Sequence, residues 1–447
     1  MKSFSFALAI TLSCFATSSF AVQRTKAQRP ESQPIFSTVQ KGSGSQMNKT
    51  FTEPRGVITF ADAIMAALSA NPTLAAFDRE VEAREAEALQ SGLHPNPELG
   101  AEAENVLGSG SFSGVNDAEL TLSIGQLIEL GGKRQKRARA AILNADVAAW
   151  DYEIVRLEIY QHVLTAFTEL LAAQQQIVLQ QDLVMVAQEA LKSIEHRIEA
   201  GRESPAEAAR ARVELSKTTI ALEKMQHQML ALKNNLAATW GSTDAQFDRV
   251  EGDLEKLSEL PDLQTLQEYI EQNPQVSAWA TAVQQRDAEL ELARAQRIPD
   301  PVVEGGLRRL NGSGDHAFVF GLSLPLLLFD RNQGAIEAAE IRRQQAKDQQ
   351  KAVEIALYNE LVGIHAQLAA STLEIEQLRS TVIEDAQNAF DLINQGFKMG
   401  KYGFLDVLDA QRTLFEVKSQ YVNALSEYHI ALAALERLIG RNISQIQ

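Results

Sequence analysis

The sequence predicts a mainly α-helical protein with a small β part, internally duplicated into two copies of one structural plan. Ala, Gln, Glu and Leu dominate long stretches of the 447 residues, and aromatic residues make up only 6%. Two segments of about 67 residues contain almost no Gly or Pro, which is typical of long helices. Related motifs recur in the same order along both halves of the chain, which indicates a duplicated unit.

The repeat is seen in pairs of segments whose offset stays near 200 residues. This period is far too long for a solenoid repeat, so the pairs indicate a duplication of a whole structural unit. Four pairs carry the resemblance: NPTLAAFDREVEAREAEAL from Asn71 with NPQVSAWATAVQQRDAELEL from Asn273, HPNPELGAE at 94–102 with IPDPVVEGG at 298–306, LTLSIGQLIEL from Leu120 with FGLSLPLLLFD from Phe320, and AGRESPAEAARARVEL from Ala200 with MGKYGFLDVLDAQRTL from Met399.

Each repeat has the same predicted order of elements. A helix is ended by a proline pair, and two short strands, a long helix and a return helix follow. The first repeat spans 57–242, with a β-hairpin at 96–129, a long helix at 133–200 and a return helix at 204–240. After an equatorial linker at 243–262, the second repeat spans 263–447, with a β-hairpin at 300–329, a long helix at 333–399 and a return helix at 403–440.

The long helices would each extend about 100 Å, which favours long antiparallel coiled-coil pairs over a compact domain. At the N-terminus, residues 1–21 are predicted to be a signal peptide, and 22–56 a flexible leader. The only cysteine, Cys14, lies in that peptide and would be acylated if the peptide were instead a lipoprotein signal. No later segment has the roughly 18 apolar residues of a membrane helix. The chain is therefore either exported and soluble, or enters a membrane as a β-barrel.

The predicted strands alternate apolar and polar residues, which favours one apolar and one wet face. In Ala118–Ile128, Leu120, Leu122 and Ile124 share one face, whereas Glu119, Thr121, Ser123 and Gly125 share the other. Four strands cannot close a barrel, because about eight is the smallest number. Three chains would supply twelve strands, with long helices continuing from one end. The alternative is two surface hairpins packed on a soluble core.

The composition excludes several classes of function. A net charge of −16 argues against a nucleic-acid-binding protein, which needs a basic face. The seven histidines form no metal-binding motif, and no nucleotide-binding or hydrolase fingerprint is present. We therefore expect no cofactor and no metal site.

The duplicated plan resembles the TolC-like outer-membrane efflux proteins over roughly residues 57–442. ELTLSIGQLIELGGKRQKRARAA at 119–141 is similar to the heavy-metal efflux branch, the CzcC and CusC type, and GFLDVLDAQ at 403–411 to the family's periplasmic-tip motif. The resemblance implies a homotrimer with a 12-stranded outer-membrane β-barrel that continues into a 12-helix periplasmic α-barrel. It implies outer-membrane lipid, a periplasmic membrane-fusion adaptor and a proton-driven inner-membrane RND pump as partners, and it implies no enzyme activity.

Two acids at the start of the last helix, Asp406 and Asp409, carry the main site prediction. Asp406 could be a first-turn acid that the helix dipole favours, as Glu207 is at the matching position after the Ser204-Pro205 cap. The resemblance instead places both acids on the periplasmic gate, where three chains would gather six carboxylates around one axis and attract cations. Glu207 and Arg210 would then tie neighbouring helices shut.

The turns between the helices carry the remaining site predictions. Gly201, Ser204, Gly400 and Gly403 lie in turns that reverse the chain, and the resemblance makes these turns contact points for the adaptor. The resemblance also places the junction of barrel and tunnel at Gly131 and Gly132. The residues alone favour an ordinary solvated face for the basic run GGKRQKR at 131–137. The tyrosine and arginine that brace the closed tip of the family's drug channel are replaced by Phe397 and Tyr402, so the latch must differ.

Three functions remain open on sequence grounds. The first is the outer-membrane channel of a tripartite system that exports heavy-metal cations. The second is a TolC-like duct for drug efflux or type I protein secretion. The third is a soluble periplasmic coiled-coil scaffold. The sequence does not identify the metal or other cargo, because a conduit makes few specific contacts with what it carries.

Overall fold

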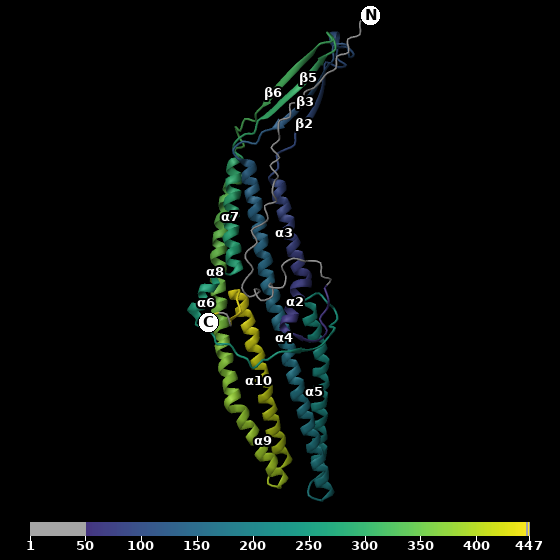
Figure 1. The fold of residues 1–447 in the computed structure, drawn as a ribbon, viewed down its shortest axis with the longest axis vertical. Helices are drawn as coiled ribbons and strands as arrows, with labels where there is room; N and C mark the ends of the chain where they lie inside the picture. Colours follow the sequence, from purple (N-terminus) through teal and green to yellow (C-terminus); the bar gives the residue numbers. More distant parts are fainter. Residues whose placement is uncertain (1–50, 444–445, 447) are drawn as a thin grey trace. The chain divides into compact units, whose positions relative to one another are not determined.

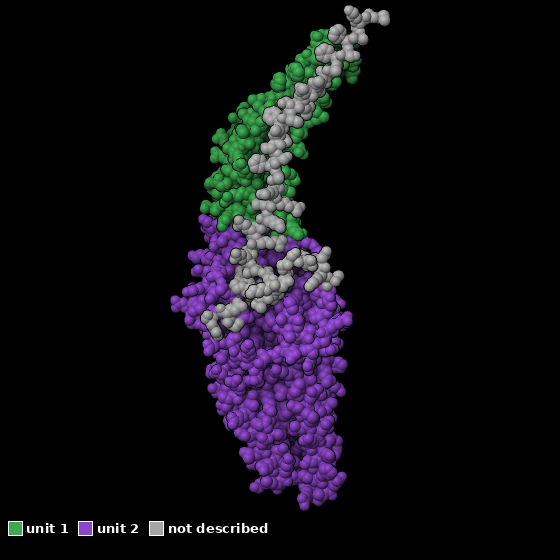
Figure 2. All heavy atoms as spheres, in the orientation of Figure 1, with its two compact units in different colours: residues 1–29, 81–146, 284–343 green, residues 30–80, 147–283, 344–447 purple. Residues whose placement is uncertain are grey.

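The structure is a computed structural model that describes residues 51–443 and 446. The predicted signal peptide, Cys14 and the leader up to residue 50 lie outside the described residues. The described chain divides into two compact units, shown in different colours in Figure 2. Unit 1 contains residues 81–146 and 284–343, and unit 2 contains the described residues of 30–80, 147–283 and 344–447.

Unit 1 contains one four-stranded antiparallel sheet in the order β2-β3-β5-β6 (Figure 1). Its strands are β2 (Glu98–Glu104), β3 (Glu119–Leu127), β5 (Val302–Leu310) and β6 (His316–Ser323), and a short 3₁₀ turn, η2 (Gly110–Phe112), lies between β2 and β3. The two predicted hairpins are therefore joined edge to edge, because β3 of the first repeat pairs with β5 of the second.

The register of this sheet separates apolar from polar side chains, as the alternating pattern predicts. Leu122 is the partner of Ala101 on one side and Leu307 on the other, and Leu307 in turn pairs with Phe318. Residues two apart on each strand share this face. Its large side chains are exposed: Leu99 is 72% and Phe320 is 84% accessible to solvent.

Nine α-helices are described in the residues that the structure covers. They are α2 (Phe60–Ala70), α3 (Pro72–Ser91), α4 (Lys133–Glu199), α5 (Pro205–Ala238), α6 (Leu263–Ile270), α7 (Pro274–Ala295), α8 (Gln333–Gln377), α9 (Ile383–Lys398) and α10 (Phe404–Ile439). Within the same ranges, no single helix is both long enough and apolar enough to cross a membrane, and the bent pair of α2 and α3 reaches that threshold only when its two helices are taken together.

Three features differ from the sequence prediction. The single helix predicted at the start of each repeat is two helices, α2 and α3 in the first repeat and α6 and α7 in the second. The long helix predicted at 333–399 is interrupted by a single π-helical turn, η3 (Leu378–Val382), which divides it into α8 and α9. The predicted linker contains a strand, β4 (Phe247–Glu251), which pairs in parallel with β1 (Gly56–Thr59) at the end of the predicted leader. Each of these strands has only four or five residues, and their apolar side chains are buried in the core of unit 2. Such short segments carry too few alternating residues to be predicted as strands from the sequence.

Unit 2 is built on two hydrophobic cores. The larger packs α2, α4, α6, α8 and α10 around fully buried side chains such as Leu170, Trp240 and Tyr428. A smaller cluster, called the tip core below, lies near the turns after α4 and α9. It consists of Ile194, Ala208, Ala211, Phe390, Phe397, Phe404, Val407, Ala410 and Leu414.

Candidate functional site

The predicted site residues lie at the ends of two helical hairpins in unit 2. The first tip hairpin is formed by α4 and α5, and the second by α9 and α10, and the helices of each pair lie side by side in Figure 1. Gly201 and Gly400 end the descending helices with φ angles of 70° and 77°, a conformation that glycine adopts without strain. In both turns the residue after the glycine, Arg202 or Lys401, donates its N–H to the carbonyl of the residue five positions earlier, at 2.8 Å. This hydrogen bond is characteristic of a Schellman motif.

The return helices begin with different caps. In the first tip hairpin, the Oγ of Ser204 accepts a hydrogen bond from the N–H of Ala206 at 3.2 Å, and Pro205 occupies the first helical position. In the second, Gly403 offers no side chain, and the Oδ2 of Asp406 accepts from the N–H of Gly403 at 2.8 Å. Asp406 therefore has the first-turn capping role that the sequence allowed.

The charges that follow these caps also differ. Glu207 and Arg210 form an ion pair of 2.9 Å within α5, so the first tip hairpin neutralises its own charges. Asp409 is exposed on α10, and its carboxylate makes no hydrogen bond or ion pair with any residue in the described part of the chain. The start of α10 thus presents two exposed carboxylates, Asp406 and Asp409, and neither forms an ion pair in the described part of the chain.

Within one chain, the Glu207–Arg210 ion pair of α5 does not contact the acids Asp406 and Asp409 of α10. No hydrogen bond or ion pair among the described residues connects Glu207 or Arg210 with the acids of α10. The first turns of α5 and α10 instead share the tip core, through Ala208 and Ala211 on one side and Val407 and Ala410 on the other.

The two positions that replace the tyrosine and arginine have distinct environments. The ring of Tyr402 packs on Gly396, where an added Cβ would lie 2.3 Å from the ring. Phe397 is buried, and its backbone carbonyl accepts a hydrogen bond of 2.8 Å from the Nη1 of Arg197. The sequence prediction missed Arg197, and its one available signal was a cation in the last turn of a helix.

A second candidate region lies in unit 1, where β3 leads into α4. Gly131 and Gly132 have φ angles of 68° and 69°, so the chain turns through two consecutive left-handed residues. A Cβ at Gly131 would also come within 2.5 Å of the Ile298 side chain. These two glycines are required by the bend itself.

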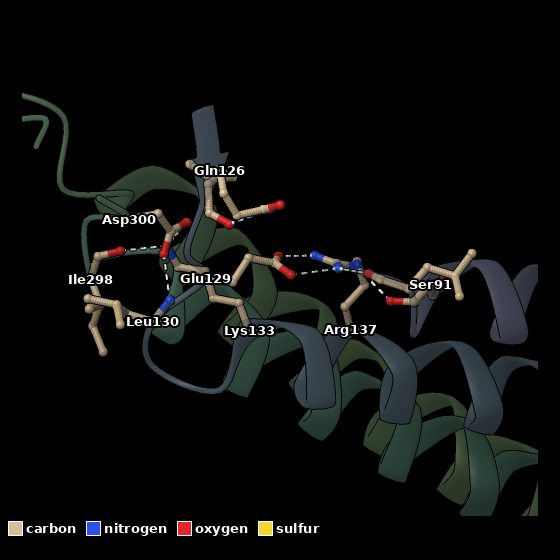
Figure 3. A network of polar contacts seen from close by, with 10 residues as sticks. Ser91, Gln126, Glu129, Leu130, Lys133, Arg137, Ile298 and Asp300 are labelled. Atoms are coloured by element: carbon tan, nitrogen blue, oxygen red, sulfur yellow. Dashed lines mark hydrogen bonds and ion pairs between the residues drawn. The ribbon is translucent and has the colours of Figure 1, made fainter. Parts of the chain in front are cut away.

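The lysine after these glycines is buried in a polar network (Figure 3). The Nζ of Lys133 donates to the Oδ2 of Asp300 at 2.6 Å and to the carbonyl of Ile298 at 2.5 Å. The other oxygen of Asp300 accepts from the N–H of Leu130 at 2.8 Å. Asp300 therefore ties the segment before β5 to the turn before α4.

Arg137 completes this network one turn later. It forms two hydrogen bonds with the carboxylate of Glu129, at 2.6 and 3.2 Å, and its Nε donates to the carbonyl of Ser91 at 2.8 Å. This contact lowers the pKa of Glu129 and raises that of Arg137. The prediction of a solvated face for GGKRQKR is therefore wrong for Lys133, which is buried, whereas the paired Arg137 stays partly exposed. Cations at a helix N-terminus oppose the dipole, and paired carboxylates offset that cost.

No group of three or more His, Cys, Asp or Glu side chains that could hold a metal ion occurs within residues 51–443. The tip acids and the polar network are thus arrangements of charge and hydrogen bonds, which can attract cations or fix a bend but offer no chelating set.

Comparison with known proteins gives concordant results. The family model described as outer membrane efflux protein matches residues 63–242 and 265–441, one segment in each repeat. The cobalt-zinc-cadmium resistance protein CzcC of Cupriavidus metallidurans is 31% identical over 91% of this chain and 96% of that protein. The nickel-cobalt-cadmium resistance protein NccC of Alcaligenes xylosoxydans is 27% identical over 61% of each chain.

Among solved structures, the outer membrane protein VceC from Vibrio cholerae has a TM-score of 0.71 and 21% identity, covering 86% of this chain and 96% of that one. The resemblance inferred from the sequence is confirmed, and with it the predicted location in the bacterial outer membrane. This protein belongs to the outer membrane efflux protein family.

Proposed function

We propose that three copies of this chain form an outer-membrane channel that exports heavy-metal cations, with a periplasmic adaptor and an inner-membrane RND pump as partners. In this proposal the sheets of unit 1 form a β-barrel in the membrane, and the helices of unit 2 form a tunnel in the periplasm. The chain itself supplies the passage, and the pump supplies the energy.

The observation that carries the proposal is the exposed apolar face of the sheet. Aromatic and aliphatic side chains on all four strands of one face are open to solvent in the isolated chain, among them Leu122, Leu307 and Phe318. A soluble protein rarely exposes a contiguous apolar surface of this kind. Contact with hydrocarbon lipid would remove it from water and lower the free energy.

The opposite face of the same sheet is suited to water. Arg308 forms ion pairs of 2.8 Å with Glu104 and with Glu119, and its Nε donates to Thr121. The further carboxylates of this face, Glu98, Glu102 and Glu304, are exposed. A polar lumen and an apolar outside are the two surfaces that a membrane barrel requires.

The sheet also has two open edges. Neither β2 nor β6 has a second neighbour among the described strands, and unpaired strand edges are costly in lipid. Three copies of the four strands give twelve, which is enough to close a barrel. Unpartnered apolar side chains on α5 and α8, such as Val213, Ile220 and Leu373, would be covered by neighbouring copies of unit 2.

The cargo is inferred from relatives whose names state resistance to cobalt, zinc, cadmium and nickel. A channel needs no chelating site for such ions, and weak, repeated attraction by carboxylates serves conduction better than tight binding. The tip turns at Gly201–Ser204 and at Gly400–Gly403 are exposed, and we assign them to contact with the adaptor.

The gate is assigned to Asp406 and Asp409. In a trimer these two positions supply six carboxylates around the axis, and this ring of negative charge attracts cations. Glu207 and Arg210 already neutralise one another in each chain. We assign this pair the role, implied by the family resemblance, of tying neighbouring helices shut.

The test uses purified trimer in planar bilayers. Wild-type protein is expected to give a small, cation-selective conductance. Asp409→Asn alone should lower the cation-to-anion permeability ratio, and with Asp406→Asn the ratio should fall severalfold. Asp248→Asn in β4 removes the same charge away from the tip and should leave the ratio at the wild-type value.

Three outcomes separate the parts of the proposal. A wild-type protein that inserts but never conducts would reject the channel, and an unchanged ratio in the double variant would reject the gate. A deletion strain should become sensitive to divalent metal ions and recover with the wild-type gene. Sensitivity to drugs with normal metal tolerance would favour the drug-efflux alternative.

A further inference from the structure

We infer that Arg197 is a latch that ties the first tip hairpin to the second and sets how readily the gate opens. The inference rests on the proposed channel function and deepens it, because it names a residue outside the acidic pair. The latch joins the last turn of α4 to the last turn of α9, where the chain turns toward the gate acids.

The contact has two components. The Nη1 of Arg197 donates to the carbonyl of Phe397 at 2.8 Å, and the guanidinium lies 4.5 Å from the centre of the Phe397 ring. The same guanidinium is held from the other side by Glu203, at 3.4 Å from its Nη2. Glu203 lies in the turn of the first tip hairpin, so it orients the arginine without crossing between hairpins.

The backbone carbonyl of Phe397 is a favourable hydrogen-bond acceptor for a cation. Phe397 lies in the last turn of α9, where backbone carbonyls carry the negative end of the helix dipole, and its carbonyl accepts from Arg197 in addition to the N–H of Gly400 at 2.9 Å. The arginine is three-quarters buried, so this charge-assisted bond is shielded from water and salt. Because the acceptor is a backbone atom, the bond forms whatever side chain occupies position 397.

Other polar contacts between the two tip hairpins are sparse. The next hydrogen bonds between them in the described chain come from Gln176, 21 residues before Arg197 on α4, to Ser419 and Asn423. Between the positions of Gln176 and Arg197 along the hairpins, an exposed ion pair of 3.7 Å joins Arg412 to Glu214.

Packing between the two hairpins is also incomplete in the stretch between Gln176 and Arg197. A hollow of about 290 Å³ lies between α4, α5 and α10, lined by Gln180, Glu214 and Gln411 among others. Gln411 is buried, yet neither atom of its amide has a hydrogen-bond partner. An unsatisfied buried amide costs free energy, so this region resists separation of the hairpins weakly. The small tip core and Arg197 must then supply most of the attachment near the turns.

The duplication does not provide a second latch. At the repeat offset of 199 residues, which aligns Gly201 with Gly400, Arg197 corresponds to Gly396 and Glu203 to Tyr402. The ion pair of the first turn is thus replaced in the second by a ring packed on a glycine. Each chain therefore has one such cross-hairpin bond, and a trimer has three.

The first test measures channel opening in planar bilayers. Arg197→Ala should raise the open probability or the mean conductance severalfold. Arg197→Lys keeps the charge but loses the planar donor and the ring contact, so it should lie between alanine and wild type. The control is Arg212→Ala, which removes an exposed cation paired with Glu195 at 3.6 Å within the first tip hairpin. Equal behaviour of the Arg197 and Arg212 variants would overturn the inference.

The second test does not depend on conduction. Cysteines introduced at the exposed positions Arg202 and Lys401 carry spin labels, one in each tip turn, and the distances between labels are measured by pulsed electron resonance. Arg197→Ala should broaden and lengthen the distance distribution, and Arg212→Ala should not. An unchanged distribution would reject the latch itself. Separated hairpins with unchanged conductance would reject its control of the gate, and a wild-type protein that does not conduct would reject the proposed function alone.

Discussion

The two repeats share their backbone at the tip hairpins but use their side chains differently. Both descending helices end in the same glycine turn, with equal hydrogen bonds. After that turn the first repeat pairs Glu207 with Arg210, whereas the second leaves Asp409 without a partner in the described chain. Duplication thus preserved the bends, which depend on backbone conformation, while the charges diverged. Acids without an ion-pair partner in the first two turns of the return helix occur in the second repeat, at Asp406 and Asp409, within the described chain.

The same asymmetry occurs away from the tips. Asp300 stands between Pro299 and Pro301 and binds the buried Lys133, whereas Asn96 stands between the matching prolines of the first repeat and is exposed. Near the ends of the return helices, buried Glu436 corresponds to buried Ala237. Each of these pairs offers a matched experiment, in which one repeat serves as the control for the other.

The largest effect is expected at the proline pairs. Asp300→Ala leaves the buried Lys133 without its carboxylate, and breaking a buried ion pair in this way costs about 4 kcal/mol. Asn96→Ala, the matched control, should change the free energy of unfolding by less than about 0.5 kcal/mol. Thermal unfolding of both variants in detergent, followed by circular dichroism, measures the difference. Similar unfolding temperatures would show that the two repeats are equivalent at this position.

A smaller effect, with a defined pH dependence, is expected at Glu436. Its Oε2 accepts from the hydroxyl of Tyr160 at 2.7 Å, its Oε1 accepts from the N–H of Ile443, and burial raises its pKa to about 7. Between its unfolded value of 4.5 and 7, the native state holds a proton that the unfolded chain has released. Stability from this group is therefore complete below pH 4.5 and is lost as the pH rises to about 7.

The shift corresponds to about 3 kcal/mol over that range. Glu436→Gln, which cannot ionise, should unfold with a flatter pH profile and be the more stable protein at pH 8. The measurement is the unfolding temperature of both proteins from pH 4.5 to 8. A parallel decline in both would locate the pH dependence elsewhere in the chain.

The smallest effects are expected at the caps of the return helices. Ser204→Ala removes a side-chain acceptor from the start of α5 and should cost about 1 kcal/mol. Gly403→Ser should gain a few tenths of a kcal/mol, because φ at Gly403 is −82° and an added Cβ meets nothing closer than 3.5 Å. Hydrogen exchange in the first turns of α5 and α10 reports both changes. A loss of protection in the Gly403 variant would show that the start of α10 does not accept the serine cap used by α5.

The sequence by itself determined the order of the two hairpins and of the long and return helices. Glycine and proline act through local backbone conformation, so Gly201, Gly400 and the proline pairs mark the same breaks that the structure shows. The period-two pattern around Leu122 fixed which side chains share a face, because a strand has no other way to place alternate residues. The capping position of Asp406 was likewise readable from three residues of sequence.

Only the tertiary structure decided which distant groups meet. The pairing of β3 with β5, the burial of Lys133 against Asp300 and the bond from Arg197 to Phe397 each join residues more than 160 positions apart. A basic run such as GGKRQKR looks the same on a solvated face and in a buried network. Its energy depends on carboxylates and carbonyls supplied by remote segments, and that information is absent from any local pattern.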